Sequence, residues 1–99
     1  MSDPTFDPAR VYVDLNEMVE PDVVLLAKGD ERADSDGNVV RLREGLRVLI
    51  WSDDLDDAGN FDPLLGEGVV ERNHYDAPWC QHVKWCCRLD GALRNRSAG

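Results

Sequence analysis

The residues with the greatest potential for chemistry lie close together near the C-terminal end of the chain. Two histidines and three cysteines fall within fourteen consecutive positions, namely His74, Cys80, His82, Cys86 and Cys87. Imidazole nitrogens and thiolates are ligands that zinc prefers, and four of them complete a tetrahedral site. A thiol beside an imidazole is also a pair used in nucleophilic catalysis. The sequence therefore raises two chemistries, metal binding and covalent catalysis.

The spacing of these residues does not favour zinc. The pattern over 82–89 predicts a strand, in which His82 and Cys86 would lie about 13 Å apart on one face. That separation is too great for one ion without a bulge, although a helical segment would bring His82 and Cys86 together and a loop could do the same for His74 and Cys80. The core side of this strand would hold Val83, Trp85, Cys87 and Leu89, and its outer side Lys84, Cys86 and Arg88. We predict no metal and no cofactor, and keep a zinc-binding or metal-stabilised domain as the alternative, with His74, Cys80, His82 and Cys86 as its ligands.

Recognisable catalytic motifs are missing from the sequence. Gly66-Glu67-Gly68 lacks the Lys-Ser/Thr pair and the following helix that a phosphate-binding loop requires, and no GxSxG segment occurs. Nothing in the spacing fixes a cysteine against a histidine. We therefore predict no catalytic residues, and a small enzyme of unknown reaction is the third alternative.

Oxygen ligands gather in a second cluster that could be a calcium loop. Its members are Asp53, Asp54, Asp56, Asp57, Asn60 and Asp62. Counted from Asp54, the loop departs from the EF-hand pattern because Ala58 takes the third ligand position and Leu65 takes that of the bidentate glutamate. We predict a solvated acidic turn without calcium.

Aromatic residues supply the leading functional hypothesis. Tyr75, Pro78 and Trp79 lie in a segment without apolar periodicity, and large aromatic side chains are enriched at protein interfaces. Loops on a rigid scaffold commonly carry function. We predict a non-catalytic module that binds a protein or peptide partner through these three residues, with nearby acidic loops adding electrostatic selection.

Short apolar runs separated by turn residues indicate the elements that hold these groups. The predicted strands are 11–15, 23–27, 39–42, 46–51, 69–72 and 82–89, and a helical turn capped by Asn16 is expected at 16–20. The predicted core contains Val24, Leu26, Val48, Ile50, Val69, Trp85 and Leu89. This pattern predicts a mostly β fold, a small barrel or a compact twisted antiparallel sheet of five or six short strands with at most one or two helical turns.

The order of strands and turns resembles that of SH3-like small β-barrels. The resemblance rests on Arg43–Trp51, Gly66–Glu71 and His82–Trp85 and covers roughly residues 22–90. It implies a barrel fold, whereas the aromatic-rich groove of proline-binding SH3 domains is missing from the sequence. The resemblance therefore implies a fold more than an activity.

Charge and length narrow the possible partners and location. The net charge of −9 repels phosphate backbones, so nucleic acid is not an expected partner. The sequence shows no long apolar run and no secretory signal, and an odd number of cysteines suits a reducing compartment, so we expect a cytoplasmic protein without membrane binding. A chain of 99 residues suits one domain, with an ordered core over about 10–91, a flexible N-terminal arm and a flexible C-terminal tail.

Overall fold

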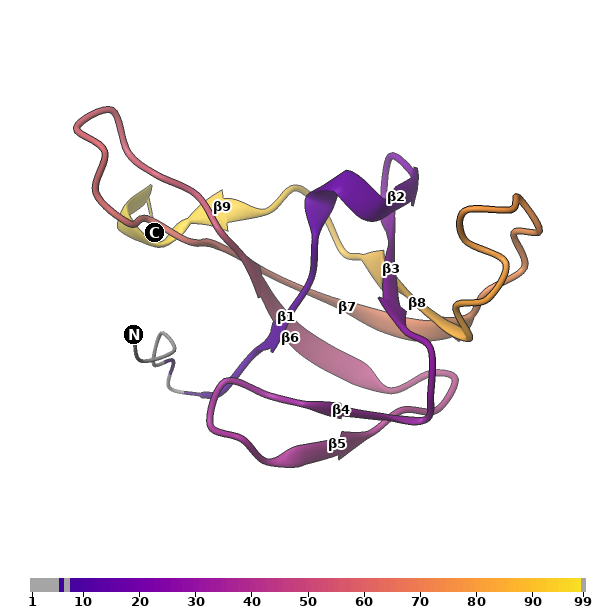
Figure 1. The fold of residues 1–99 in the computed structure, drawn as a ribbon. Helices are drawn as coiled ribbons and strands as arrows, with labels where there is room; N and C mark the ends of the chain where they lie inside the picture. The colour runs from indigo at the N-terminus through magenta and orange to yellow at the C-terminus, as the bar shows by residue number, and fades with distance from the viewer. Residues whose placement is uncertain (1–5, 7, 99) are drawn as a thin grey trace.

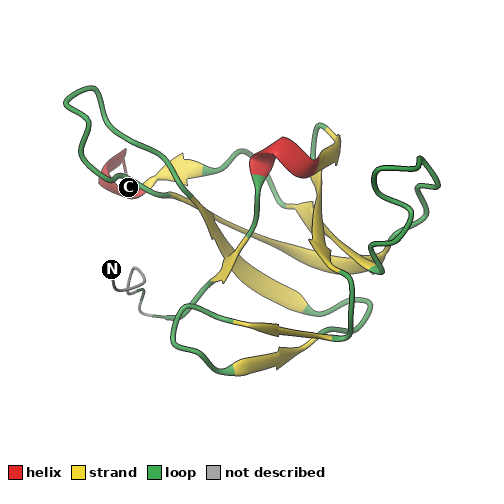
Figure 2. Ribbon diagram, in the orientation of Figure 1, coloured by secondary structure: helices red, strands yellow, loops and turns green. Residues whose placement is uncertain are grey.

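The computed structural model, which describes residue 6 and residues 8–98, is built mainly of β-strands (Figures 1 and 2). This confirms the mostly β prediction. The strands are β1 Val11–Tyr12, β2 Met18–Glu20, β3 Val23–Ala27, β4 Glu31–Ala33, β5 Val39–Arg41, β6 Arg47–Ser52, β7 Leu64–Arg72, β8 Trp85–Leu89 and β9 Arg94–Asn95. Two short 3-10 turns, η1 at Leu15–Glu17 and η2 at Arg96–Ala98, are the only helical elements in this part of the chain.

Most strands belong to one sheet that curls into a half-barrel. Its order is β1-β6-β7-β8-β3-β2, and β9 pairs with the start of β7. The β1–β6 pair is parallel, and the other pairs are antiparallel. β4 and β5 form a separate two-stranded sheet that lies below the half-barrel in Figure 1. Curling hides most of one sheet face, which gives a short chain an interior.

Two glycines allow the curled sheet to pack closely around β7. A Cβ atom added at Gly68 would lie 2.4 Å from the backbone oxygen of Arg88 and 2.6 Å from the Cys87 sulfur. A Cβ atom at Gly66 would lie 2.1 Å from a Leu93 side-chain carbon. The Gly66-Glu67-Gly68 segment is therefore a packing device within a strand, which is a common use of strand glycines.

The interior of the half-barrel confirms most of the predicted core. Val24, Leu26, Val48, Ile50 and Trp85 are buried in one cluster, and Leu89 packs partly buried against it. The prediction for Val69 is wrong, because Val70 is fully buried and Val69 is half-buried. Successive side chains along β7 point to opposite faces of the sheet. Gly68 and Val70 therefore share the inward face, and Val69 lies on the outer face.

A second hydrophobic cluster covers the outer face of β3 and β8. It contains Val23, Leu25, Cys80, Val83 and Cys86. The unbroken apolar run of β3 reflects this burial on both faces. Cys86 does face away from the half-barrel interior, as the strand pattern predicts, but it is completely buried because the segment preceding β8 folds over it.

Several local predictions need correction. Asp14, rather than Asn16, caps the helical turn, accepting a 2.9 Å hydrogen bond from the Asn16 backbone N–H, and Met18–Glu20 forms a strand instead of continuing the turn. The sequence does not predict strand β4, because Glu31–Ala33 is polar and carries no apolar alternation.

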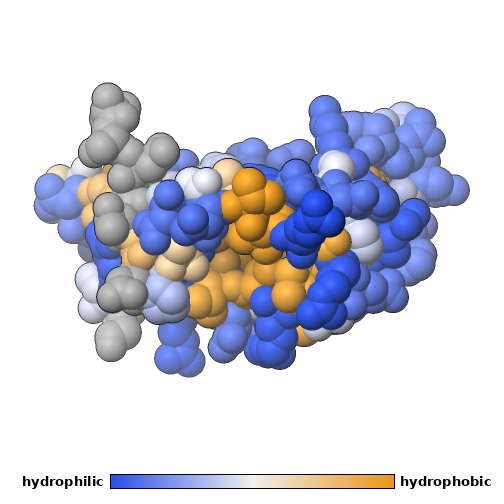
Figure 3. All heavy atoms as spheres, turned by 90° about the horizontal axis from the view of Figure 1, so that it is seen from below, coloured by the Kyte–Doolittle hydropathy of each residue, from blue (hydrophilic) through white to orange (hydrophobic). Residues whose placement is uncertain are grey.

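The face on the side of β4 and β5 has a hydrophobic centre bordered by hydrophilic residues (Figure 3).

The two chain ends bear on the predicted arm and tail. Residues 1–5 and 7 of the predicted arm lie outside the described residues, while Phe6 packs 5.3 Å from Trp51 between ring centroids. In the predicted tail, Leu64 and Leu65 of β7 pair with Asn95 and Arg94 of β9. The flexibility of both ends stays a prediction.

The close packing at Gly68 gives a test of this fold. Gly68→Ala places a methyl group against backbone that cannot easily move, so we expect a loss of about 1–3 kcal/mol in the free energy of unfolding. Gly29→Ala is the matched control, because a Cβ atom there meets nothing within 4 Å. Urea titration of both variants checks the prediction, and equal stabilities would contradict the close contact between β7 and β8.

Candidate functional site

The candidate partner-binding residues lie in the segment Asn73–Lys84, which we call the Trp79 loop. It connects β7 to β8 and projects at the right of Figure 1. The prediction that residues 82–84 begin a strand is wrong, since β8 starts at Trp85 and His82 lies in a turn. Hydrogen bonds to the carbonyl oxygen of Ala77 from the backbone N–H groups of Cys80 and Gln81, at 3.0 and 2.9 Å, form that turn.

One side chain fixes the shape of the Trp79 loop. The Asn73 amide nitrogen donates hydrogen bonds of 2.9 Å to the carbonyl oxygens of both Cys80 and Val83. Its oxygen accepts a 2.9 Å bond from the Tyr75 backbone N–H. The Asn73 backbone N–H also donates to the Lys84 carbonyl oxygen at 2.9 Å, which closes the base of the loop. The amide thus uses both of its polar ends to satisfy backbone groups that a strand ladder would otherwise pair.

The two sides of the Trp79 loop have opposite environments. Cys80 and Val83 are 1% and 7% exposed and pack into the second cluster over β3 and β8. Trp79 is 53% exposed, and Pro78 beside it is also exposed. Burial of the neighbouring residues holds the loop in place, so the indole ring of Trp79 is presented to solvent by an ordered backbone.

Tyr75 has a different position from the other two candidates. It is half-buried against the second cluster, and its hydroxyl donates a hydrogen bond to the Glu20 carboxylate at the end of β2. That hydrogen bond is the main reason that the pKa of Tyr75 is raised to about 12. Tyr75 therefore joins the loop to the neighbouring strand and offers less free surface than Trp79.

The histidines and cysteines do not converge. His74 and His82 are exposed, whereas Cys80 and Cys86 are buried beneath the loop. Over residue 6 and residues 8–98, the structure contains no group of three or more His, Cys, Asp or Glu side chains arranged to hold a metal ion. Burial raises the pKa of Cys86 to about 11 and that of Cys87 to about 12, so neither thiol is a ready thiolate near neutral pH.

The acidic segment Asp53–Pro63, which we call the acidic hairpin, connects β6 to β7. One aspartate stabilises the tip of the hairpin: Asp56 Oδ1 accepts hydrogen bonds from the backbone N–H groups of Ala58 and Asn60 at 2.9 and 2.8 Å. Asp62 accepts two bonds from Ser97, which lower its pKa. The cluster can be recognised in the sequence, but the bonds from Ser97 cannot, because they depend on the C-terminal segment folding back.

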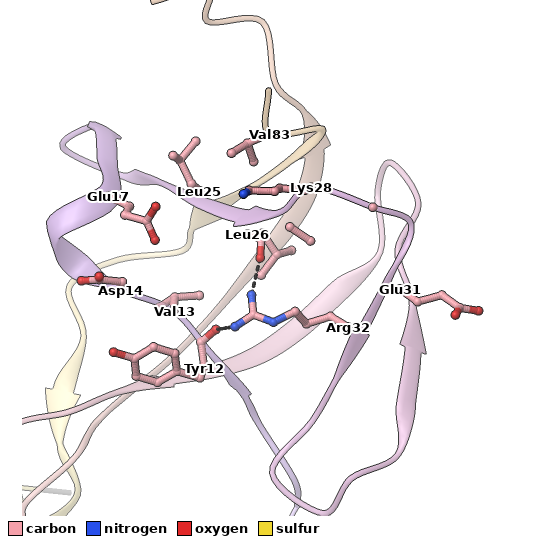
Figure 4. Close-up of a pocket in the computed structure, with 12 residues that line it drawn as sticks. Tyr12, Val13, Asp14, Glu17, Leu25, Leu26, Lys28, Glu31, Arg32 and Val83 are labelled. Atoms are coloured by element: carbon pink, nitrogen blue, oxygen red, sulfur yellow. Dashed lines mark hydrogen bonds between the residues drawn. The ribbon is translucent and has the colours of Figure 1, made fainter. Parts of the chain in front are cut away.

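A surface pocket of about 370 Å³ opens between β1, η1, β3 and β4 (Figure 4). The Arg32 guanidinium lies at its centre and donates hydrogen bonds to the carbonyl oxygens of Leu26 and, at 2.8 Å, Tyr12. Asp14 and Glu17 stand on one wall and Lys28 on another. Nothing in the sequence singles out Arg32, because only the tertiary fold brings its polar strand beside these carbonyl groups.

Comparison with known proteins adds no family assignment: no family model, curated protein or solved structure matches the chain. The relation to SH3-like barrels therefore stays a prediction from the strand pattern. In the described part of the chain, no helix is long and apolar enough to cross a membrane.

The buried thiols give a pH dependence that can be measured. An unfolded cysteine has a pKa of about 8.5. Because the folded pKa values of Cys86 and Cys87 are higher, their contribution to stability is complete below that pH and is lost as pH rises toward about 11–12. We expect the free energy of unfolding to fall as pH is raised above about 8.5, and to fall less steeply in Cys87→Ala.

Chemical denaturation of the wild-type protein and Cys87→Ala over this alkaline range measures the two slopes. Since the lysines and the tyrosines are common to both proteins, the difference between the slopes reports on the thiol. Identical slopes would show that Cys87 is not protected in the folded state.

Proposed function

We propose that this protein is a non-catalytic module that binds a protein or peptide partner through the Trp79 loop. The observation that carries the proposal is the 53% exposure of Trp79 on a loop that is anchored by two buried residues, Cys80 and Val83. A large aromatic side chain exposed in this way does not contribute its full area to the core. In an interface it would supply a rigid anchor with few rotatable bonds.

The hydrogen bonds of Asn73 support the same proposal. Because they fix the path of the loop backbone in the free protein, that backbone would not have to be ordered during binding. Such preorganisation lowers the entropic cost of association. Pro78 extends the exposed surface next to Trp79, and Tyr75 fixes the side of the loop that faces β2.

Substitution of Trp79 should separate binding from folding. Trp79→Ala is expected to weaken partner binding by about 2 kcal/mol or more, while stability changes much less. A partner peptide can be obtained by selection from a random library on the wild-type protein, and its affinity for each variant measured by calorimetry. Thermal unfolding of the same variants reports on stability.

Val39→Ala is the matched control, because Val39 is 64% exposed but lies on β5 outside the loop. The selected peptide should bind Val39→Ala as well as it binds the wild type. If Trp79→Ala unfolds the protein, or if selected peptides bind it undiminished, Trp79 is not the anchor of a recognition surface.

A further inference from the structure

The acidic hairpin exposes a second apolar surface, which is separate from the Trp79 loop. Leu55 and Phe61 are 62% and 43% exposed and form an isolated antiparallel bridge with each other. Residues paired in this way have side chains on the same face of a hairpin. The two side chains therefore form a single apolar spot. The acidic hairpin that carries it projects at the upper left of Figure 1, at the opposite end of the molecule from the Trp79 loop.

The backbone beneath this spot is held on both arms. Hydrogen bonds join Asp56 N–H to the Asn60 carbonyl oxygen at 2.8 Å and Asp62 N–H to the Asp54 carbonyl oxygen at 2.9 Å. The side-chain amide of Asn95 donates to the Asp54 carboxylate at 2.7 Å and thereby ties the hairpin to the C-terminal segment. Gly59, with φ at +85°, allows the tight turn at the tip.

The base of the spot continues the aromatic packing of the sheet. The Phe61 ring meets Trp51 edge-on, with 6.2 Å between centroids, and the Arg96 guanidinium lies 6.0 Å from the Phe61 ring centre. Trp51 is buried, so Phe61 is supported from below while its outer surface stays open. Leu55, beside it, is 62% exposed and leaves most of its side chain open to solvent.

The charge around the spot identifies the kind of partner. Residues 53–62 contain five aspartates and no lysine or arginine, Asp53 and Asp57 are exposed, and the Arg96 guanidinium beside Phe61 offsets one of these negative charges. Residues 1–67 carry 17 acidic and 6 basic side chains, a net charge of −11. A second copy of this chain would be repelled by the same field, whereas a basic segment would be attracted.

We propose that the acidic hairpin docks a basic amphipathic segment of a partner protein. Apolar side chains of that segment contact Leu55 and Phe61, and its lysines or arginines face Asp53 and Asp57. The aspartates select the partner and speed its approach, and the apolar pair supplies the area that leaves water. This surface is independent of the partner proposed for the Trp79 loop.

The experiment uses the full chain and a defined probe, a short fluorescent amphipathic helix composed of leucine and lysine. We expect fluorescence anisotropy to show binding at low salt that weakens as salt is added. Leu55→Ser should weaken it by at least about tenfold. Val39→Ser removes an exposed apolar residue elsewhere and should leave the affinity unchanged.

A second pair of variants separates the hairpin from the net charge of the whole protein. The double variant Asp53→Asn with Asp57→Asn should weaken binding by at least about tenfold. Asp36→Asn with Glu44→Gln changes the net charge equally, at exposed positions outside the hairpin, and should have a much smaller effect. Equal losses from the two double variants, no loss from Leu55→Ser, or no binding of the probe would overturn the proposal.

Discussion

The half-barrel depends on one arginine, Arg32. Its side chain bridges a gap between β1 and β3 that no strand of the half-barrel fills. β2 pairs only with Val23 and Val24 at the start of β3, so it does not extend to the half of β3 that lies across from β1. Arg32 fills this position by donating to carbonyl oxygens on both sides, those of Tyr12 and Leu26. Burial lowers the pKa of the Arg32 guanidinium, but an arginine keeps its charge at any ordinary pH. The second sheet, which carries Arg32, is thereby tied to the first.

An exposed tryptophan can lie on an ordered loop because other residues of that loop cover the outer face of β3 and β8. The outer face of these strands requires a cover, and Cys80 and Val83 provide it. Their burial fixes the backbone on either side of the turn, and Asn73 satisfies the carbonyl groups that this path leaves without strand partners. The exposure of Trp79 is thus a consequence of how a neighbouring core is completed.

The sequence predicts the strands whose apolar residues alternate or form a continuous run. It does not predict a strand that forms only because its backbone pairs with a neighbouring strand. Arg47–Ser52 can be recognised because its alternation matches its two faces, whereas the polar strand β4 has no such signal. Val69 and Val70 are adjacent and equally apolar, so only the packing of Gly68 shows which one points inward. The candidate binding loop can be singled out from its aromatic residues. Its support by Asn73 could not be predicted, because the bonds of Asn73 span ten positions and depend on the loop's path.

The length of β7 fixes the distance between the end of the acidic hairpin and the start of the Trp79 loop. The acidic hairpin leads into the strand at Leu64, and the Trp79 loop leaves it after Arg72. Nine extended residues span roughly 30 Å, and hydrogen bonds to strands on both sides keep them straight enough to act as a spacer. Ligands held by the two loops would be kept apart by a separation that the backbone geometry determines. Changes in the sequence of either loop would leave the length of this strand unaltered.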